Sequence, residues 1–335
     1  MLDGMVLIII VITLALIFDF TNGWNDSANA IATVIATRVL KPLHAVMLAA
    51  VLNMAGAFAF TAVAKMISTG IVNPDYINLY VVVALLIGSI IWNIAMTLIG
   101  LPISASHSLI GAIIGAAVAH GGFGIIIAGG VYKVLLAMLI SPLLGALIAY
   151  TIMKILYALF GQVSPSKVKQ LFGKLQIVSV SWMAFSHGSS DAQKAMGVIM
   201  MALVAGGFGG ITMEDPIPVW VIFSCGMMIA LGTAVGGWKV IRTMGMRLSK
   251  LESIHGFAAE TAAAIILTTV SKIGVPVSST HTITGSIIGV GLSNRFNSVR
   301  WGVAGKIIFA WIFTLPGTGL MAFLVYKLLV VLGIT

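Results

Sequence analysis

Long apolar segments separated by short polar loops recur along the whole chain. Each is long enough to cross the hydrocarbon core of a bilayer, which takes about 20 apolar residues in a helix. These Ile-, Leu-, Ala- and Gly-rich runs lack the strict alternation of barrel strands, so they predict helices. We expect spans at 5–36, 44–70, 79–99, 131–160, 176–205, 218–241, 255–272 and 302–331.

The same motif begins the segment that follows two of these spans. Leu101-Pro-Ile-Ser-Ala-Ser-His107 and Val275-Pro-Val-Ser-Ser-Thr-His281 lie 174 residues apart and share Pro, Ser and His at matching places. In each copy proline ends the preceding helix, hydroxyl residues can cap a new one, and a Gly-spaced apolar run follows. Because the N-terminus of a helix attracts negative charge, both copies are candidate anion sites.

Two spans contain a polar stretch within otherwise apolar sequence. Phe20–Ala32 aligns without gaps with Phe185–Gly197, and Asp26 corresponds to Asp191 at an offset of 165 residues. These polar, glycine-containing runs predict that both helices are interrupted, the first near residues 19–26. A charge at the bilayer centre costs about 3 kcal/mol even on the most lenient scale, so we expect a bound partner at each carboxylate.

The distribution of charged residues predicts the topology of the two halves. When the two segments that follow the proline motifs are counted with the eight spans, each half has five crossings. Basic loops then fall on one side and acidic loops on the other, as expected when Lys and Arg are enriched in cytoplasmic loops. We therefore expect a first repeat at 1–160, a basic cytoplasmic linker at 161–174 and a second, inverted repeat at 175–335, with both termini outside. This fold class is an all-α polytopic membrane protein with two inverted-topology repeats, a plan typical of secondary transporters. The alternative is a re-entrant hairpin at 103–130, which would change the number of crossings.

Composition supports the same class. The 335 residues are 60% hydrophobic and only 8% charged, whereas a soluble domain carries about 25% charged residues. The 18 Lys and Arg against 9 Asp and Glu fit cytoplasmic loops, so we expect no nucleic-acid partner. The sequence contains no G-x-x-x-x-G-K-[ST] loop, which argues against a pump driven by ATP.

Carboxylates inside the spans are candidate cation ligands. Asp26 and Asn29 are three residues apart and share a helix face. Their oxygens, with backbone carbonyls freed at Gly23, suit an alkali cation such as sodium better than a transition metal. Asp191 is the second candidate, and its neighbour Lys194 occupies the place of Asn29. This lysine is either a fixed-charge substitute for a cation or a side chain that snorkels to the interface.

Glu260 is another carboxylate within a span. A buried carboxylate of this kind can hold a sodium ion or a proton, and we treat it as a candidate cation ligand. A structural hydrogen-bonding role explains it equally well.

Hydroxyl groups of the two motifs form a candidate oxyanion site. Several O–H and backbone N–H donors at two helix starts can hold a tetrahedral oxyanion. We expect oxyanion ligands at Ser104, Ser106, Ser278, Ser279 and Thr280, with Asn25 and Ser190 from the polar stretches. His107 and His281 have no cysteine or carboxylate cluster at ligand spacing, so packing or hydrogen bonding explains them better than metal binding.

These residues resemble the inorganic phosphate transporter (PiT) family of sodium/phosphate symporters over nearly the whole chain. The family signature Gly-x-Asn-Asp-x-x-Asn-Ala is similar to Gly23-Trp-Asn-Asp-Ser-Ala-Asn-Ala30, and its second form resembles His187–Gly197. The resemblance implies that sodium is held by Asp26, Asn29 and Asp191, and phosphate by the residues after Pro102 and Pro276. The chain departs from the family pattern at three positions. Ser190 replaces the usual Asn, and Lys194 replaces an Asn found in one branch of the family. Asn53 replaces a Glu that some members carry.

The predicted function is cation-coupled symport of inorganic phosphate by a multi-pass protein of the cell membrane, with Na⁺ as the coupling ion. The alternatives are proton-coupled symport of phosphate or metal-phosphate, and a permease for sulfate or another oxyanion. A membrane-embedded enzyme using His107 or His281 is a further alternative, which the duplication of the motif disfavours. The resemblance implies a homodimer. We expect contact with membrane lipids, no enzymatic activity and no organic cofactor.

Overall fold

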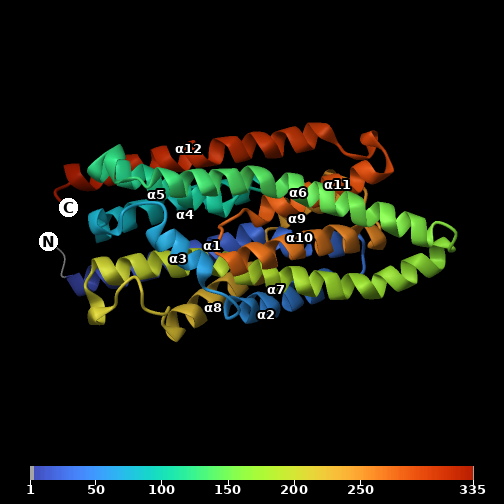
Figure 1. The fold of residues 1–335 in the computed structure, drawn as a ribbon, viewed down its shortest axis with the longest axis horizontal. Coiled ribbons are helices and arrows are strands. Elements are labelled where there is room, and N and C mark those ends of the chain that lie inside the picture. Colours follow the sequence, from blue (N-terminus) through green and yellow to red (C-terminus); the bar gives the residue numbers. More distant parts are fainter. Residues whose placement is uncertain (1–3, 335) are drawn as a thin grey trace.

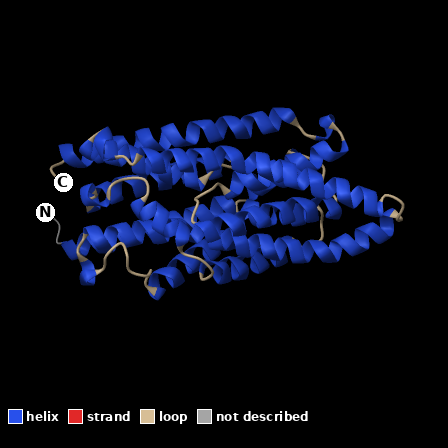
Figure 2. Cartoon of the chain, viewed as in Figure 1, coloured by secondary structure: helices blue, strands red, loops and turns tan. Residues whose placement is uncertain are grey.

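A computed structural model describes residues 4–334 as an elongated bundle of helices (Figure 1), without a β-strand in that range (Figure 2). The long helices run along the longest axis, and both termini lie at the same end. The α-helices are α1 (Gly4–Ala36), α2 (Pro42–Ala57), α3 (Ala62–Thr69), α4 (Leu79–Ile99), α5 (Ala105–Gly121), α6 (Ala128–Phe160), α7 (Pro165–Ala205), α8 (Val219–Val235), α9 (Trp238–Arg242), α10 (Ser253–Ile273), α11 (Ser279–Asn294) and α12 (Trp301–Val331). Short turns of other helix types are η1 (Pro74–Tyr76), η2 (Phe123–Ile125), η3 (Phe208–Gly210), η4 (Thr243–Arg247) and η5 (Phe296–Ser298).

Two of the predicted spans are bent pairs of helices rather than single helices. Five described helices are long and apolar enough to cross a membrane by themselves, and the two bent pairs bring this number to seven. The axes of α2 and α3 differ by 69°, and those of α8 and the segment Trp238–Arg247 by 64°. The second break falls where Gly236 adopts a φ of 72°, a conformation that glycine tolerates. The helix breaks of this fold therefore lie in 44–70 and 218–241.

In contrast, α1 and α7 continue without a break through their polar stretches, so the interruptions predicted there are wrong. The glycines in these stretches serve close packing instead. A Cβ atom at Gly23 would collide with the backbone of Ile229, and one at Gly188 with the backbone of Asn53. Because both helices are continuous, the backbone carbonyl at Gly23 is not freed as predicted. A ligand at these stretches would mainly contact side chains.

Two helical hairpins enter the bundle from opposite ends. α4 and α5 form the first, and antiparallel pairing of Val72 with Ile126 ties the loops around its outer ends together. α10 and α11 form the second, next to the corresponding pairing of Ser249 with Val299. The 33-residue helix α6 connects these two ends of the molecule (Figure 1).

The tips of the two hairpins meet inside the bundle. Each begins its turn at a glycine with positive φ, 85° at Gly100 and 77° at Gly274. Ser106, in the first turn of α5, donates a hydrogen bond of 2.7 Å to the backbone oxygen of Val277. Tips that enter from opposite ends can touch only if neither hairpin crosses the whole bundle. This geometry, with at most seven candidate spans among the described residues, contradicts the prediction of five crossings per half and favours a re-entrant hairpin. The hairpin is formed by α4 and α5, so it begins well before the predicted range 103–130.

Basic residues gather at the end of the bundle opposite the termini. A cavity of about 1030 Å³ is lined there by Arg38, Lys169 and Lys174, among others. Most of the polar segment 161–174 belongs to α7, which begins at Pro165. The acidic loop between α7 and α8 lies at the terminal end. This separation of basic and acidic residues is the one that the predicted topology requires. The boundary between two repeats at 161–174 stays a prediction.

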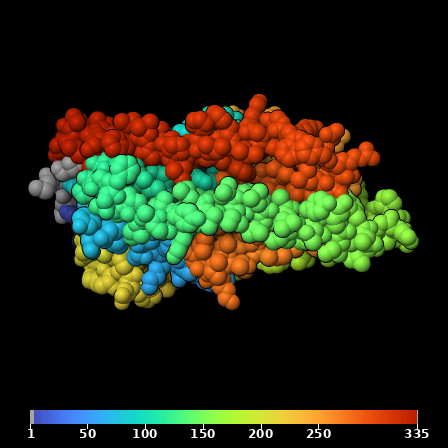
Figure 3. Space-filling view, turned by 45° about the horizontal axis from the view of Figure 1, so that its top comes forward, coloured from blue at the N-terminus to red at the C-terminus, as the bar shows by residue number. Residues whose placement is uncertain are grey.

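α6 and α12 form much of the surface visible in Figure 3. Their exposed large apolar side chains include Tyr132, Leu139, Leu143, Leu147, Phe309, Ile312 and Leu320. Apolar side chains exposed along helices of membrane-spanning length are expected to face lipid.

Candidate functional site

The proline motifs place their hydroxyl residues at the N-termini of α5 and α11, as predicted. Ser104 and Ser278 are the N-cap residues, and their Oγ atoms accept hydrogen bonds of 3.1 Å from the backbone N–H groups of His107 and His281. Such caps satisfy donors that every helix start leaves unpaired. Both hydroxyl oxygens are thus already engaged in fixing a helix start inside the bundle.

Asp26 and Asn29 face the tip of the second hairpin. Thr280 donates a hydrogen bond of 3.1 Å to Oδ1 of Asp26. The amide nitrogen of Asn29 donates to the hydroxyls of Ser279 and Thr280, at 3.2 and 3.0 Å. Within residues 4–334, Oδ2 of Asp26 and Oδ1 of Asn29 accept no hydrogen bond although both are buried. Two unpartnered oxygens on one helix face are the donor set expected for a hard cation.

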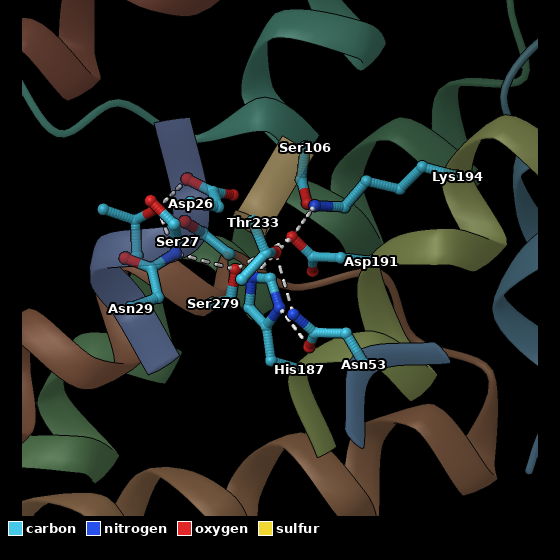
Figure 4. Close-up of polar contacts among 12 residues, drawn as sticks. Asp26, Ser27, Asn29, Asn53, Ser106, His187, Asp191, Lys194, Thr233 and Ser279 are labelled. Atoms are coloured by element: carbon cyan, nitrogen blue, oxygen red, sulfur yellow. Dashed lines mark hydrogen bonds and ion pairs between the residues drawn. The ribbon is translucent and has the colours of Figure 1, made fainter. Parts of the chain in front are cut away.

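Asp191 occupies a different environment, on α7. Its Oδ2 atom lies 2.8 Å from Nζ of Lys194 and 3.4 Å from Nε2 of His187, and it accepts a hydrogen bond of 3.1 Å from Ser279. All of these side chains are buried, so the ammonium is a fixed partner of the carboxylate rather than a snorkelling group. Figure 4 shows Ser279 between this group and the group formed by Asp26 and Asn29.

The two carboxylates belong to one site. Ligand atoms of Asp26, His187 and Asp191 all lie within 4.8 Å of one another. The hydroxyl residues Ser279 and Thr280, at the start of α11, each donate to one of the carboxylates. The predicted cation ligands and part of the predicted anion site therefore share the same hydroxyl groups.

His187 and the two residues that orient it, Asn53 and Thr233, are members of the site that the sequence did not predict. Nδ1 of His187 lies 3.0 Å from Oδ1 of Asn53, whose amide donates to Thr233 at 2.9 Å. Asn53 belongs to α2 and Thr233 to α8, so two broken spans orient the imidazole beside Asp191. The position of His187 in the aligned polar stretch was a signal for its role, but its partners are remote in sequence.

The two motif histidines pack against each other. The ring centroids of His107 and His281 are 4.5 Å apart, and His281 stacks on Trp311 at 3.7 Å. The indole N–H of Trp311 donates to the backbone oxygen of Pro102 at 3.2 Å. This arrangement fits the predicted packing role, because the rings cover the junction of the two hairpin tips.

The remaining predicted residues lie at different distances from this centre. Asn25 donates a hydrogen bond of 2.8 Å to Thr97 of α4. Ser190 is buried, and no hydrogen bond joins it to another candidate residue within the described part of the chain. Glu260 belongs to a separate cluster, where Thr33 donates to it at 2.5 Å, Gln176 at 2.9 Å and Ser179 over a short contact.

A row of buried polar side chains on α1 connects these groups. Its members follow one another at intervals of three and four residues, which places them on one face of the helix: Asp19, Asn22, Asp26, Asn29 and Thr33. Thr37, one turn further, lines the cavity at the basic end of the molecule. The row therefore leads from the carboxylate pair through the Glu260 cluster towards that end.

Two opposed hairpins bring capped helix starts to buried carboxylates, inside a bundle of membrane-length helices. This arrangement is that of a multi-pass membrane transporter. The chain belongs to the phosphate transporter family, whose sequence profile matches residues 22–322.

Similar proteins support this assignment. The chain is 44% identical over 322 residues to a probable low-affinity inorganic phosphate transporter of Rhizobium meliloti (strain 1021), covering 96% of each sequence. It is 40% identical over 327 residues to a protein of the same description from Bacillus subtilis (strain 168), covering 97% of this chain and 98% of the relative. A solved structure described as the sodium-dependent phosphate transporter matches with a TM-score of 0.91 at 24% identity, over 97% of this chain and 99% of that one, which confirms the fold.

Proposed function

We propose that this chain moves inorganic phosphate across the cell membrane by symport with a cation, with sodium as the first candidate and a proton as the alternative. The observation that carries the proposal is the sharing of hydroxyl groups at the start of α11. Ser279 and Thr280 donate to Asp191 and Asp26, and the same hydroxyls are placed to hold an anion at a helix N-terminus.

Sharing of these donors couples the two substrates. With the carboxylates bare, their charge repels phosphate and their oxygens occupy the hydroxyl donors. A cation at Asp26 and Asn29 neutralises one carboxylate and lets the hydroxyl of Thr280 turn towards the anion. By linkage, phosphate then strengthens cation binding by the same factor.

The phosphate cradle in this proposal consists of hydroxyl and N–H donors from both hairpin tips. Ser106 and Ser279 would donate from facing helix starts, with Thr280 beside them, once the hydroxyl of Ser106 turns away from the backbone oxygen of Val277 and that of Ser279 from Asp191. Ser104 and Ser278 hold the helix starts in place, and Asn25 and Ser190 complete the polar surroundings as more remote candidates.

Lys194 gives the second carboxylate a permanent counter-ion. Its ammonium stands where a cation would otherwise neutralise Asp191, so we assign one mobile coupling cation to the pair Asp26 and Asn29. Glu260 is a candidate for a further cation, although three donors already surround its carboxylate. The equivalence of the two halves supports the inverted-repeat plan, and a homodimer is part of the proposal.

Sulfate is the competing substrate. Phosphate can donate a proton to an acceptor at neutral pH, whereas fully ionised sulfate cannot. Within residues 4–334, Oδ1 of Asp191 accepts no hydrogen bond and is not part of the proposed cation site, so it is such an acceptor and favours phosphate.

Uptake of labelled phosphate into proteoliposomes tests the proposal. An inward sodium gradient, or an inward proton gradient in a parallel sample, is imposed at constant membrane potential. One of the two gradients is expected to drive accumulation, and excess sulfate is expected to leave uptake unchanged. Uptake that ignores both gradients would contradict symport, and strong inhibition by sulfate would favour the broader oxyanion permease.

A further inference from the structure

A cluster of unpaired cations lies outside the phosphate site, next to the tip of the first hairpin. It lines a cavity of about 490 Å³ and consists of Lys239, Arg242, Arg247 and Lys306. All four side chains are exposed, and no salt bridge joins any of them to a carboxylate within residues 4–334. No Asp or Glu lines this cavity, so its charge has a single sign.

The cavity lies between the tip of the first hairpin and the first turns of α12, because its lining includes Gly100, Leu101 and Lys306. Arg300, at the start of α12, donates its backbone N–H to the oxygen of Leu248, next to Arg247. Lys306 follows Arg300 by six residues, or about 9 Å along the helix. Lys306 therefore lies close to the start of the membrane-length helix α12.

An apolar groove continues from the cationic cavity. It has a volume of about 480 Å³, shares Leu101 and Lys306 with the cavity, and is completed by Gly302, Gly305 and Phe309. A Cβ atom built on Gly302 or Gly305 meets nothing within 4 Å, so the missing side chains leave the flank of α12 open. Phe309 is 62% exposed at the far end of this groove.

We propose that this surface binds an anionic phospholipid, with the headgroup phosphate in the cationic cavity and one acyl chain along the groove of α12. Charge complementarity selects an anion, and the continuous apolar groove selects an anion that carries a hydrocarbon chain. Basic pockets between membrane helices on the cytoplasmic side bind lipid headgroups in this way. A free phosphate ion would use the cations but would gain nothing from the groove.

Occupation of this site would bear on the hairpin that carries Ser104 and Ser106. Thr243 of η4 donates to the oxygen of Gly100 at 3.0 Å, and Lys239 donates to the oxygen of Leu98 at 2.7 Å. The elements that form the cavity thus also hold the hairpin tip. A headgroup bound there would stabilise the tip by offsetting repulsion among the four cations.

Native mass spectrometry of the full chain in detergent tests the proposal. The protein is titrated with phosphatidylglycerol or with phosphatidylcholine, and the affinity of the tightest-bound lipid is measured. Phosphatidylglycerol is expected to bind more tightly, and each charge removed in Arg242→Gln and Lys306→Gln should weaken it about fivefold, since a basic residue near the surface contributes about 1 kcal/mol. Lys327→Gln, near the other end of α12, is the matched control and should leave the affinity unchanged.

Gly305→Leu separates the possible occupants, because it keeps every charge and fills the groove without a clash. It should weaken phosphatidylglycerol binding, which a site for free phosphate would not do. The proposal is overturned if the charge variants bind the lipid like the wild type, or if millimolar inorganic phosphate displaces it. It is also overturned if Gly305→Leu converts a dimer to a monomer while lipid binding is unchanged, since the groove would then be an interface between copies.

Discussion

Nζ of Lys194 lies 2.8 Å from Oδ2 of Asp191, three residues earlier on α7, and both side chains are buried. At the aligned place on α1, Asn29 follows Asp26, and no basic side chain within residues 4–334 forms a salt bridge with that carboxylate. One carboxylate of the pair therefore carries its own counter-ion, and the other depends on a cation from solution.

Replacement of the ammonium by a neutral ligand should create a second cation requirement. In Lys194→Asn, the second half acquires the Asp and Asn arrangement of the first, so we expect one additional cation to move with each phosphate. The stoichiometry is obtained from the membrane potential at which phosphate flux through proteoliposomes reverses. An unchanged stoichiometry would show that Lys194 does not act in place of a cation.

The same pair also makes a prediction about stability. Lys194→Met leaves a buried carboxylate without a counter-ion, which should lower the free energy of unfolding by about 3–5 kcal/mol. The double variant Asp191→Asn with Lys194→Met removes both charges and should recover most of this loss. Thermal unfolding in detergent measures both, and a double variant no more stable than Lys194→Met would contradict a self-neutralising pair.

Asp26→Asn should uncouple phosphate binding from the cation. The amide keeps the size of the side chain and can still accept the hydrogen bond from Thr280, so folding should persist. Coupling between two sites typically changes affinity by about 5- to 150-fold. We expect sodium to raise phosphate affinity by a factor in this range in the wild type, and to have no such effect in Asp26→Asn. Equilibrium binding of labelled phosphate with and without sodium measures this, and Asp75→Asn in the exposed turn η1 is the control.

Ser104 and Ser106 provide a test of capping against ligand binding. Ser104→Ala removes an N-cap and should cost about 1 kcal/mol of stability with a modest effect on phosphate affinity. Ser106→Ala removes the hydrogen bond to Val277, which should also cost about 1 kcal/mol of stability. It removes in addition a donor to phosphate, and a hydrogen bond to a charged group is worth about 1.5–3 kcal/mol, so phosphate affinity should fall by about 10- to 150-fold. The melting temperature and the transport KM of each variant distinguish a capping residue from a phosphate ligand. A larger rise in KM for Ser104→Ala than for Ser106→Ala would make Ser104 the ligand.

Local sequence was sufficient to predict the parts of this fold that local chemistry decides. Span lengths follow from the thickness of the bilayer, and the helix starts at Ser104 and Ser278 follow from the order of proline and hydroxyl residues. The continuity of α1 was not predictable in this way, because Gly23 packs on Ile229, a residue far along the chain.

The missed features of the site depend on similarly remote contacts. His187 owes its orientation to Asn53, 134 residues away, and the depth of the hairpins depends on the contact of Ser106 with Val277, 171 residues away. Lys194 was identified as a candidate by alignment of the two halves, yet only its burial decided between an ion pair and a snorkelling side chain.

The orientation of the bundle makes a prediction that chemical labelling can check. Cys225 is buried, so a single cysteine introduced at an exposed loop should dominate the reaction with a membrane-impermeant maleimide. Glu214→Cys, in the acidic loop at the terminal end, should react in intact cells. Ser164→Cys, in the short loop between α6 and α7 at the basic end, should react only after permeabilisation, because basic loops are retained in the cytoplasm. Labelling of Ser164→Cys in intact cells would place the basic end outside, and the lipid site near Lys306 would then face the outer leaflet.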